Sequence, residues 1–386
     1  MCRRQWHFAV CLAIQLAVYE RTAHGVCLLL YGSNYMLILG IETTCDETAA
    51  AVVREGRYVV SSVVSSQIDL HAKYGGVVPE IAARAHLESL NALVAEALEQ
   101  AGLDPASAGR EGGVDGVAVA HAPGLIGCLL VGVAAAKALA FAWEKPLIPV
   151  NHVQAHLYST LLHDGPADMP LAPPPEFPAL GLVISGGHSS IYHVMGFDRL
   201  ERIGATHDDA VGEAYDKVAA ILQLGYPGGP LVDRLAQSGN PQAINFPLSL
   251  LEKNSLDFSF SGIKTSVLYY VNGKQGRERD ASALSESQKA DVAASFQRAV
   301  ATILAEKLRR AAGQYPARSL LIGGGVSANS AIRVRLLELG RELGLPVLIP
   351  SLRYCTDNAA MTAGLGYQLL KVGKTAGLDL EAIATV

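Results

Sequence analysis

Two stretches of this chain repeat one pattern, in which an apolar run is followed by a short polar turn and a second apolar run. Residues 36–53 begin with Met-Leu-Ile-Leu-Gly-Ile and turn through Glu-Thr-Thr-Cys-Asp-Glu-Thr, and residues 180–194 turn through Gly-Gly-His-Ser-Ser. Apolar runs of this length are typical of buried strands. Each stretch therefore predicts a strand, a phosphate-sized turn and a returning strand. Because the pattern occurs twice, it predicts two lobes related by internal duplication, with a nucleotide cleft between them.

Strands and helices alternate in the first half of the chain. Apolar residues recur at helical spacing over 79–101, and 128–142 is apolar on nearly all sides, so we expect an amphipathic helix and a buried helix there. The runs 114–120 and 147–150 are predicted strands. This alternation predicts an α/β fold with a mostly parallel, layered sheet. Within the first helix, we assign His86 to the solvated face.

A proline-rich segment at 163–178 is the clearest linker, and strands and helices resume after it. We therefore expect lobe I over 36–162, with 358–386 packing back on it, and lobe II over 163–357. Later helices are expected over 209–222 and 285–312.

A glycine run near the end of lobe II suggests a ligand site. A predicted strand over 319–322 leads into Gly323-Gly324-Gly325, ahead of a helix that begins near Ser330. A strand, a glycine run and a helix N-terminus in this order are typical of an anion or nucleotide site. The spacing is not that of a P-loop, and a close-packed turn without a ligand is the alternative.

The first 35 residues differ from the rest. They hold three of the six cysteines and the pair Arg3-Arg4, and their apolar run 8–18 is too short to span a bilayer. We interpret residues 1–35 as a non-native or disordered N-terminal extension, because Met36 directly precedes the first strand. A signal peptide and a genuine accessory element are the alternatives.

Composition restricts the class of protein. Of 386 residues, 50% are hydrophobic and 17% are charged, which is typical of a well-buried α/β protein. The net charge of −5 disfavours a dedicated nucleic-acid binder, so any RNA contact is expected to be local or shared with a partner. The cysteines form no Cys-x-x-Cys pair, which fits a reducing compartment and predicts a cytoplasmic protein without a membrane partner.

A histidine pair lies in Asn151-His152-Val153-Gln154-Ala155-His156. Asn151 is a preferred helix N-cap, and histidines four apart share one helix face, where two imidazoles can bind one metal ion. Asp357, which follows another apolar run, is the candidate third ligand. A structural histidine pair is the alternative. A zinc peptidase is disfavoured, because Val153 stands where its catalytic glutamate would be.

Several motifs occur in a fixed order that resembles a known family. They are Glu42-Thr43-Thr44-Cys45-Asp46-Glu47-Thr48, the Asn-His-x-x-x-His helix, Ser185-Gly186-Gly187-His188, Gly212-Glu213-Ala214-Tyr215-Asp216-Lys217, Tyr226-Pro227-Gly228-Gly229-Pro230, Phe258-Ser259-Phe260-Ser261-Gly262, 323–329 and Cys355-Thr356-Asp357-Asn358. Together they resemble the bacterial tRNA N6-adenosine threonylcarbamoyltransferases, a family earlier described as glycoproteases. The resemblance covers Met36 to the C-terminus, and residues 1–35 have no counterpart in it.

The resemblance implies an α/β fold of the actin/hexokinase/Hsp70 (ASKHA) class. It implies transfer of the threonylcarbamoyl group from threonylcarbamoyl-AMP to N6 of the adenosine beside the anticodon, in tRNAs that read codons starting with A, with release of AMP. Two partners are implied besides tRNA, a metal-free paralogous subunit and a small P-loop ATPase.

The resemblance also implies a role for individual residues. The metal ligands would be His152, His156 and Asp357, holding one divalent ion per chain, with Fe(II) expected and Zn as the alternative. The residues that bind the substrate phosphate, adenosine and ribose would be Val183, Ile184, Ser185, Gly186, Gly187, Asp216, Gly229, Asp233 and Asn329. The acids that assist the chemistry would be Asp46 and Glu47.

Two other functions are compatible with parts of the sequence. A small-molecule kinase of the same fold explains the hairpins and glycine runs but not the histidine–aspartate set. A nucleotide-binding scaffold subunit would need neither that set nor the acids. The candidate basic residues for tRNA contact, each of which could instead lie on a solvated face, are Lys253, Lys264, Arg298, Lys307, Arg309 and Arg310.

Overall fold

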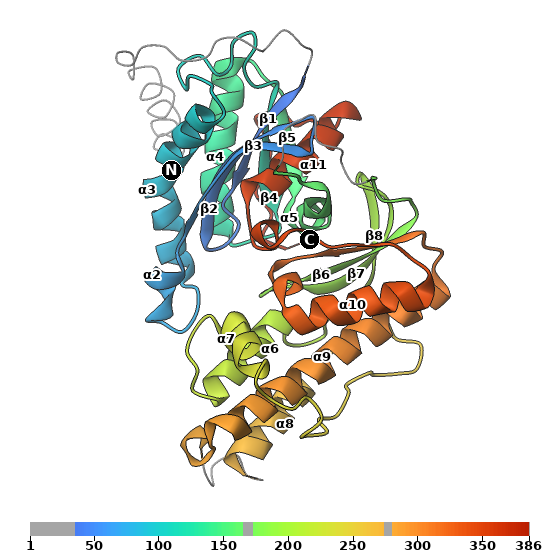
Figure 1. Cartoon of the computed structure of the whole chain (residues 1–386). Coiled ribbons are helices and arrows are strands. Elements are labelled where there is room, and N and C mark those ends of the chain that lie inside the picture. Colours follow the sequence, from blue (N-terminus) through green and yellow to red (C-terminus); the bar gives the residue numbers. More distant parts are fainter. Residues whose placement is uncertain (1–34, 165–172, 274–279, 386) are drawn as a thin grey trace. The chain divides into compact units, whose positions relative to one another are not determined.

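A computed structural model describes residues 35–164, 173–273 and 280–385. The predicted extension over 1–35 therefore lies outside the described residues, apart from Tyr35. The chain divides into two compact units (Figure 1). Unit 2 is Pro173–Thr356, and unit 1 is formed by the chain on either side of it.

Unit 1 is built on a sheet whose strands have the order β3-β2-β1-β4-β5. Their bounds are β1 Leu37–Glu42, β2 Glu47–Arg54, β3 Tyr58–Ser66, β4 Gly116–Ala122 and β5 Leu147–Asn151. The predicted first hairpin is confirmed, because β1 pairs antiparallel with β2. β4 then pairs parallel with β1, and β5 with β4. Strand β3 was not predicted.

Helices cover both faces of this sheet (Figure 1). They are α2 Ile68–Ala72, α3 Pro79–Gln100, α4 Ile126–Trp143, α5 His152–Tyr158 and α11 Ala359–Lys371, with a 3-10 turn η1 at Ser159–Leu161. The α3 and α4 side chains pack with Leu37, Leu39 and Ile41 of β1 in one core. On the other face, Gly40 leaves room for α11, because a Cβ there would meet the helix backbone at Ala363.

Two predictions for these helices need correction. His86 was assigned to a solvated face, but it is fully buried in α3, four residues before Leu90 on the side that faces the sheet. A buried helix was predicted over 128–142, yet Leu130 and Phe141 of α4 are exposed. By length and composition α4 could cross a membrane, but half of that window is buried, as in the core helix of a soluble protein.

Unit 2 repeats the topology of unit 1 with its own strands, in the order β10-β9-β6-β7-β8. Their bounds are β6 Ala179–Ile184, β7 Ser189–Gly196, β8 Arg199–Ala205, β9 Ser319–Gly323 and β10 Val347–Leu348. Strands β6, β7 and β8 form an antiparallel meander, and β9 and β10 continue parallel to β6, as β4 and β5 continue from β1. This correspondence confirms the predicted duplication.

The core of unit 2 lies between this sheet and its helices. They are α6 Val211–Ile221, α7 Gly228–Ala236, α8 Ser261–Asn272, α9 Glu286–Gln314 and α10 Ser330–Leu343, with 3-10 turns η2 Ala281–Ala283, η3 Gly325–Ala328 and η4 Leu352–Tyr354. Helix α9 begins with a capping box of Ser285 and Gln288. Its apolar side, including Phe296, packs with Leu182 and Ile184 of β6.

The unit boundaries differ slightly from the lobes expected from the sequence. His163 and Asp164 belong to unit 1, because His163 exchanges backbone hydrogen bonds with Arg57 and Val59 beside β3. Asp357 also belongs to unit 1, where α11 begins directly after its neighbour Asn358.

Candidate functional site

The histidine pair is presented by a short helix at the end of a buried strand. Asn151 ends β5 and caps α5, as predicted, because its side chain accepts a hydrogen bond from the backbone N–H of Gln154 at 3.0 Å. His152 and His156 then lie one turn apart, 6% and 0% exposed. Their ring centroids are 4.7 Å apart. The strand and the cap thus fix both imidazoles on one side of the helix.

Asp357 completes this set from a distant part of the sequence. Its Oδ1 lies 3.0 Å from Nε2 of His156 and 3.6 Å from Nε2 of His152. One ligand atom from each residue falls within 4.8 Å of the others. The three residues predicted to bind a metal are therefore together in unit 1, in a donor set that suits one metal ion.

The state of His156 supports a metal site over a structural histidine pair. Both ring nitrogens are buried. Nδ1 makes no hydrogen bond to a described residue, and Nε2 lies 3.0 Å from Oδ1 of Asp357 without the geometry of a hydrogen bond. A buried polar atom without a partner costs free energy, and a metal bound through Nε2 would satisfy one of them. Burial lowers the pKa of His152, but the carboxylates of Asp357 and Glu42 outweigh it and raise the pKa to about 9. Positive charge is therefore favoured here, whether from a proton or from a metal.

Of the predicted acids, Asp46 lies in the turn between β1 and β2, and Glu47 is the first residue of β2. The carbonyl of Asp46 accepts a hydrogen bond from the backbone of Gln67 at 2.9 Å. Burial raises the pKa of Glu47, and the carboxylates of Asp357 and Asp46 raise it further, to about 10. Glu47 is thus protonated at neutral pH when no cation is present, and a cation beside Asp357 would lower its pKa.

A buried polar network around His86 supports this turn, and this network was not predicted from the sequence. His86 contacts the carbonyl of Cys45 through Nε2 at 3.0 Å and the hydroxyl of Thr48 through Nδ1 at 2.7 Å. Burial lowers the pKa of His86, so the imidazole is neutral and donates from one nitrogen only. The available signal was helical spacing, since His86 lies four residues before Leu90 of the buried face.

In unit 2, the predicted phosphate loop is the turn after β6. Ser185 closes it, since its hydroxyl and carbonyl accept from the backbones of His188 at 3.1 Å and Gly212 at 3.2 Å. A Cβ on Gly186 or Gly187 would meet no described atom within 4 Å, so space is open above both. A turn with bare, accessible backbone can approach an anion closely.

Two more predicted substrate residues of unit 2, Asp233 and Asn329, belong to one hydrogen-bond network. Asp233 accepts from Gln297 at 3.0 Å and from the Ser330 hydroxyl at 2.7 Å. Gln297 in turn accepts from Asn329 at 2.8 Å. Sequence reasoning missed Gln297, which is buried in α9 and links the two predicted residues.

Asp216 and Gly229 belong to neighbouring helices of the same unit. Asp216, on α6, accepts from the backbone of Gly228 at 2.8 Å, at the start of α7. Gly229 has no described atom within 4 Å of an added Cβ. This hydrogen bond fixes the start of α7 against α6, and the open position follows directly after it.

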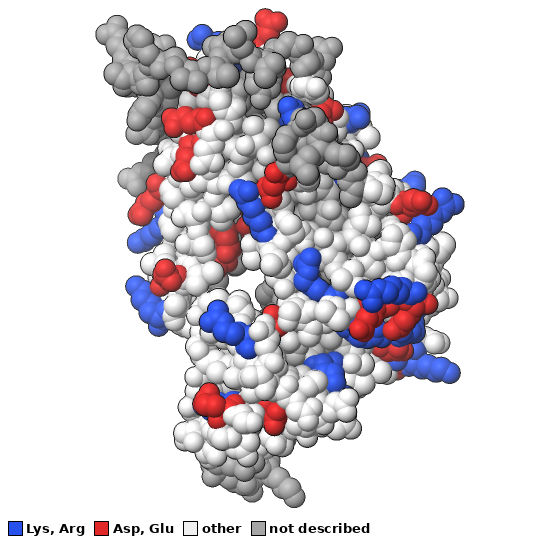
Figure 2. Space-filling view, in the orientation of Figure 1, with Lys and Arg blue, Asp and Glu red and all other residues white. Residues whose placement is uncertain are grey.

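Most of the basic residues suggested for tRNA contact are engaged within unit 2. Lys307 is fully buried and donates to the carbonyls of Leu250 and Ser255. Arg298, Arg309 and Arg310 bond to carbonyls or glutamates, and Lys264 pairs with Asp209. Figure 2 shows the described basic side chains scattered among acidic ones on the face that it draws. These residues therefore do not form a ready tRNA surface.

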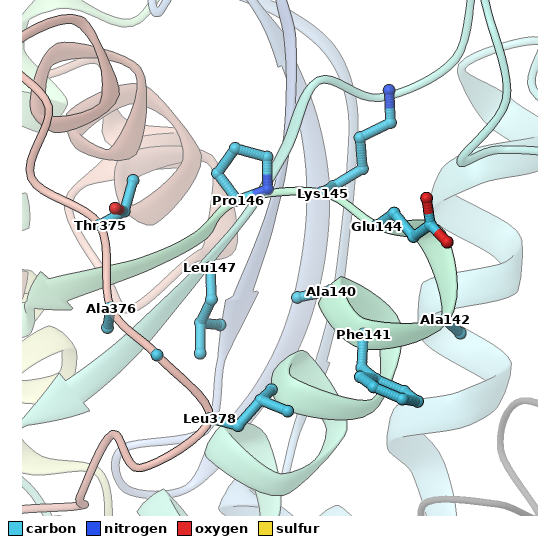
Figure 3. Close-up of a pocket in the computed structure, with 11 residues that line it drawn as sticks. Ala140, Phe141, Ala142, Glu144, Lys145, Pro146, Leu147, Thr375, Ala376 and Leu378 are labelled. Atoms are coloured by element: carbon cyan, nitrogen blue, oxygen red, sulfur yellow. The ribbon is translucent and has the colours of Figure 1, made fainter.

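A pocket of about 590 Å³ lies elsewhere in unit 1 (Figure 3). It is formed by the end of α4, the start of β5 and the chain after α11, and its walls include Phe141, Leu147 and Leu378. None of the predicted site residues lines it. The candidate site is therefore defined by its side-chain chemistry and not by this hollow.

Comparisons with known proteins identify the family. The family model of tRNA N6-adenosine threonylcarbamoyltransferase matches residues 58–364. The protein of that name from Symbiobacterium thermophilum is 49% identical over 352 residues, which cover 91% of this chain and 97% of that relative. This chain belongs to the tRNA N6-adenosine threonylcarbamoyltransferase family. The relative of that name from Anaeromyxobacter dehalogenans is also 49% identical, over 346 residues that cover 89% of this chain and 97% of that one.

Membership of the threonylcarbamoyltransferase family confirms the predicted enzyme class, a transferase that acts in tRNA modification. Among solved structures, full-length HypF in its phosphate- and nucleotide-bound form gives a TM-score of 0.53 at 13% identity, covering 90% of this chain and 47% of that one. That likeness concerns the fold alone. With the two duplicated sheets, it confirms the α/β fold of the ASKHA class.

Proposed function

We propose that this threonylcarbamoyltransferase moves the threonylcarbamoyl group from threonylcarbamoyl-AMP to N6 of the adenosine beside the anticodon, in tRNAs that read codons starting with A. The observation that carries the proposal is the set of His152, His156 and Asp357, in which both histidines are buried and Nδ1 and Nε2 of His156 make no hydrogen bond of normal geometry, in a chain of this family. A small-molecule kinase has no use for such a set.

The donor would be held by the residues of unit 2. Because an adenylate carries one phosphate, a single turn of bare backbone suffices, and Gly186 and Gly187 provide open space for it. Asp233 and Asn329 are linked through Gln297. We propose that Asp233 accepts hydrogen bonds from the adenosine or ribose and that Asn329 donates to them. Asp216 and Gly229 would complete the adenylate site.

In the proposed reaction, N6 attacks the carbonyl carbon of the donor. A new N–C bond forms, the C–O bond to the phosphate breaks, and AMP leaves with the bonding electron pair. The metal, which we propose to be Fe(II) with Zn as the alternative, would polarise that carbonyl as a Lewis acid. His152, His156 and Asp357 would hold it and leave coordination positions for substrate.

The proton lost from N6 needs an acceptor. Asp46, in the turn after β1, and Glu47, the first residue of β2, are the acids nearest in sequence to this part of unit 1. A metal ion beside Asp357 would lower the pKa of Glu47, which is raised to about 10 when no cation is present. We therefore propose that Asp46 and Glu47 assist this proton transfer.

We further propose that the protein works in the cytoplasm with a metal-free paralogous subunit and a small P-loop ATPase. The net charge of −5 and the internal engagement of the basic candidates support a shared tRNA footprint.

The test is a reconstituted reaction with labelled threonine, bicarbonate, ATP, tRNA, the adenylate-forming enzyme and the two partners. Label should enter tRNA only when this chain is present. Asp357→Ala should abolish incorporation, whereas Asp379→Ala, an exposed aspartate of the same unit, should not. Phosphorylation of a sugar or small acid by the lone chain, with no label in tRNA, would support the kinase alternative.

A further inference from the structure

A buried carboxylate beside the metal residues has no assigned role. Glu42 ends β1 and is 0% exposed. A carboxylate removed from water is costly unless donors surround it. The groups that donate hydrogen bonds to Glu42 therefore indicate its role.

The donors to Glu42 come from three elements. Oε1 accepts from the backbone N–H of Thr44 at 3.0 Å. Oε2 accepts from the hydroxyl of Thr362, on α11, at 3.0 Å and lies 3.3 Å from Nδ1 of His152. One side chain thus joins β1 to the helix that carries His152 and to the helix that begins just after Asp357.

This contact determines which nitrogen of His152 carries the proton. A carboxylate can only accept, so a 3.3 Å approach to Nδ1 is attractive only if Nδ1 bears hydrogen. In the neutral ring, which is the form that binds a metal, Nε2 then has a free lone pair, and it is Nε2 that lies toward Asp357. The hydroxyl of Thr44 is also near Nδ1, at 3.2 Å. If that hydroxyl donated to Nδ1, the ring proton would be on Nε2 and His152 could not bind a metal through Nε2.

We propose that Glu42 is the positioning residue of the metal site. It holds His152 in the tautomer and orientation that present Nε2 to the ion, and through Thr362 it anchors the helix that follows Asp357. Partners of this kind are worth about 10- to 100-fold in metal affinity. The inference rests on the metal site of the proposed function.

The test compares Zn²⁺ affinity of full-length variants, by competition with a chelator. Glu42→Gln keeps the size of the side chain, but its NH₂ group can only donate. It would therefore face another donor, either the N–H of Thr44 or the donors from Thr362 and His152. We expect the Kd to rise about 10- to 100-fold. The matched control is Glu55→Gln, since Glu55 also accepts a hydrogen bond from α11, at the hydroxyl of Tyr367, but does not contact His152. Its Kd should stay within about twofold of the wild type.

A second measurement separates positioning from mere stability. Side-chain ¹⁵N shifts of His152 in the Zn²⁺-bound protein should show protonated Nδ1 in the wild type and a changed signal in Glu42→Gln. If that variant does not fold, Thr362→Val removes one donor at nearly constant shape and should weaken Zn²⁺ about 3- to 10-fold, and Thr362→Ser should restore it.

The outcomes distinguish the two proposals. Wild-type affinity in both Glu42→Gln and Thr362→Val, with one ion bound per chain, would overturn the role of Glu42 and leave the metal site standing. Equal weakening in Glu42→Gln and Glu55→Gln would reduce Glu42 to a structural residue. A wild-type chain that binds no Zn²⁺ or Fe(II) would overturn the metal site, and the role of Glu42 with it.

Discussion

At the scale of single residues, the metal set depends on one carboxylate that is far away in the sequence. Replacing Asp357 with Ala leaves two imidazoles, which are too few to hold the ion firmly. We expect metal content to fall from about one per chain to a small fraction in elemental analysis after dialysis. Asp379→Ala should keep its metal. Full occupancy in Asp357→Ala would mean that the ion binds elsewhere.

Gln297 forms hydrogen bonds with both Asp233 and Asn329 and so links them. In Gln297→Leu the buried amide of Asn329 loses its acceptor and Asp233 loses a donor. A lost hydrogen bond of this kind is worth about 1.4 kcal/mol, or about tenfold in affinity for AMP measured by calorimetry. Gln314→Leu, on the same helix but exposed, serves as the control. Equal AMP affinity in both variants would contradict the assignment of this network to the adenylate.

At the scale of elements, the glycines after β6 and after β9 differ in how strongly the backbone requires glycine. Gly324 has φ of +91° and its added Cβ would clash with the carbonyl of Ile184, so Gly324→Ala should destabilise unit 2 by about 1–3 kcal/mol. Gly187 has no such constraint, so Gly187→Ala should change stability by less than about 0.5 kcal/mol.

The same pair tests the phosphate loop. If the phosphate lies against the turn, Gly187→Ala should lower AMP affinity despite its normal melting temperature, because the methyl group fills the open space. Chemical denaturation and calorimetry on the two variants measure both effects. A Gly187→Ala protein that binds AMP like the wild type would place the phosphate elsewhere.

At the scale of the whole molecule, the buried Lys307 should make stability depend on pH. Burial lowers its pKa, and Arg310 lowers it further, to about 8, against 10.5 in the unfolded chain. Between these values Lys307 binds more protons in the unfolded chain, so its contribution to the free energy of unfolding should rise with pH, by up to about 1.4 kcal/mol per unit. Below about pH 8 both states are protonated and the slope disappears. Glu47 and His152, whose pKa values are raised, contribute equally to wild type and Lys307→Met, so the measurement is the difference in the free energy of unfolding between the two proteins from pH 7 to 10. That difference should rise with pH above about pH 8 and stay constant below it.

The charge of the whole chain makes a prediction about tRNA. With a net charge of −5 and Lys264, Lys307 and Arg310 engaged internally, the chain alone should bind tRNA with a Kd weaker than about 1 μM at physiological salt. Adding the proposed partner subunits should tighten binding. Filter binding at two salt concentrations measures this, and nanomolar affinity of the lone chain would contradict it.

Features that depend on near neighbours in the chain and on motif order could be predicted before the structure was known. The two hairpins, the Asn151 cap, the shared helix face of His152 and His156, and the family follow from local patterns and from the order of the motifs. A cap or a periodic apolar face acts within a few residues, so the sequence predicts it well.

The buried polar contacts could not be predicted, because they join side chains that are distant in the sequence and meet only in the folded chain. Glu42 meets Thr362 across 320 positions, and Gln297 meets Asn329 across 32. His86 and Lys307 looked solvent-facing because both residue types are usually exposed, yet folding buries them against backbone carbonyls. A local pattern can place a residue on a helix or strand. Its hydrogen-bonding partner in the interior, without which its burial would cost free energy, comes from another element and depends on how the elements pack.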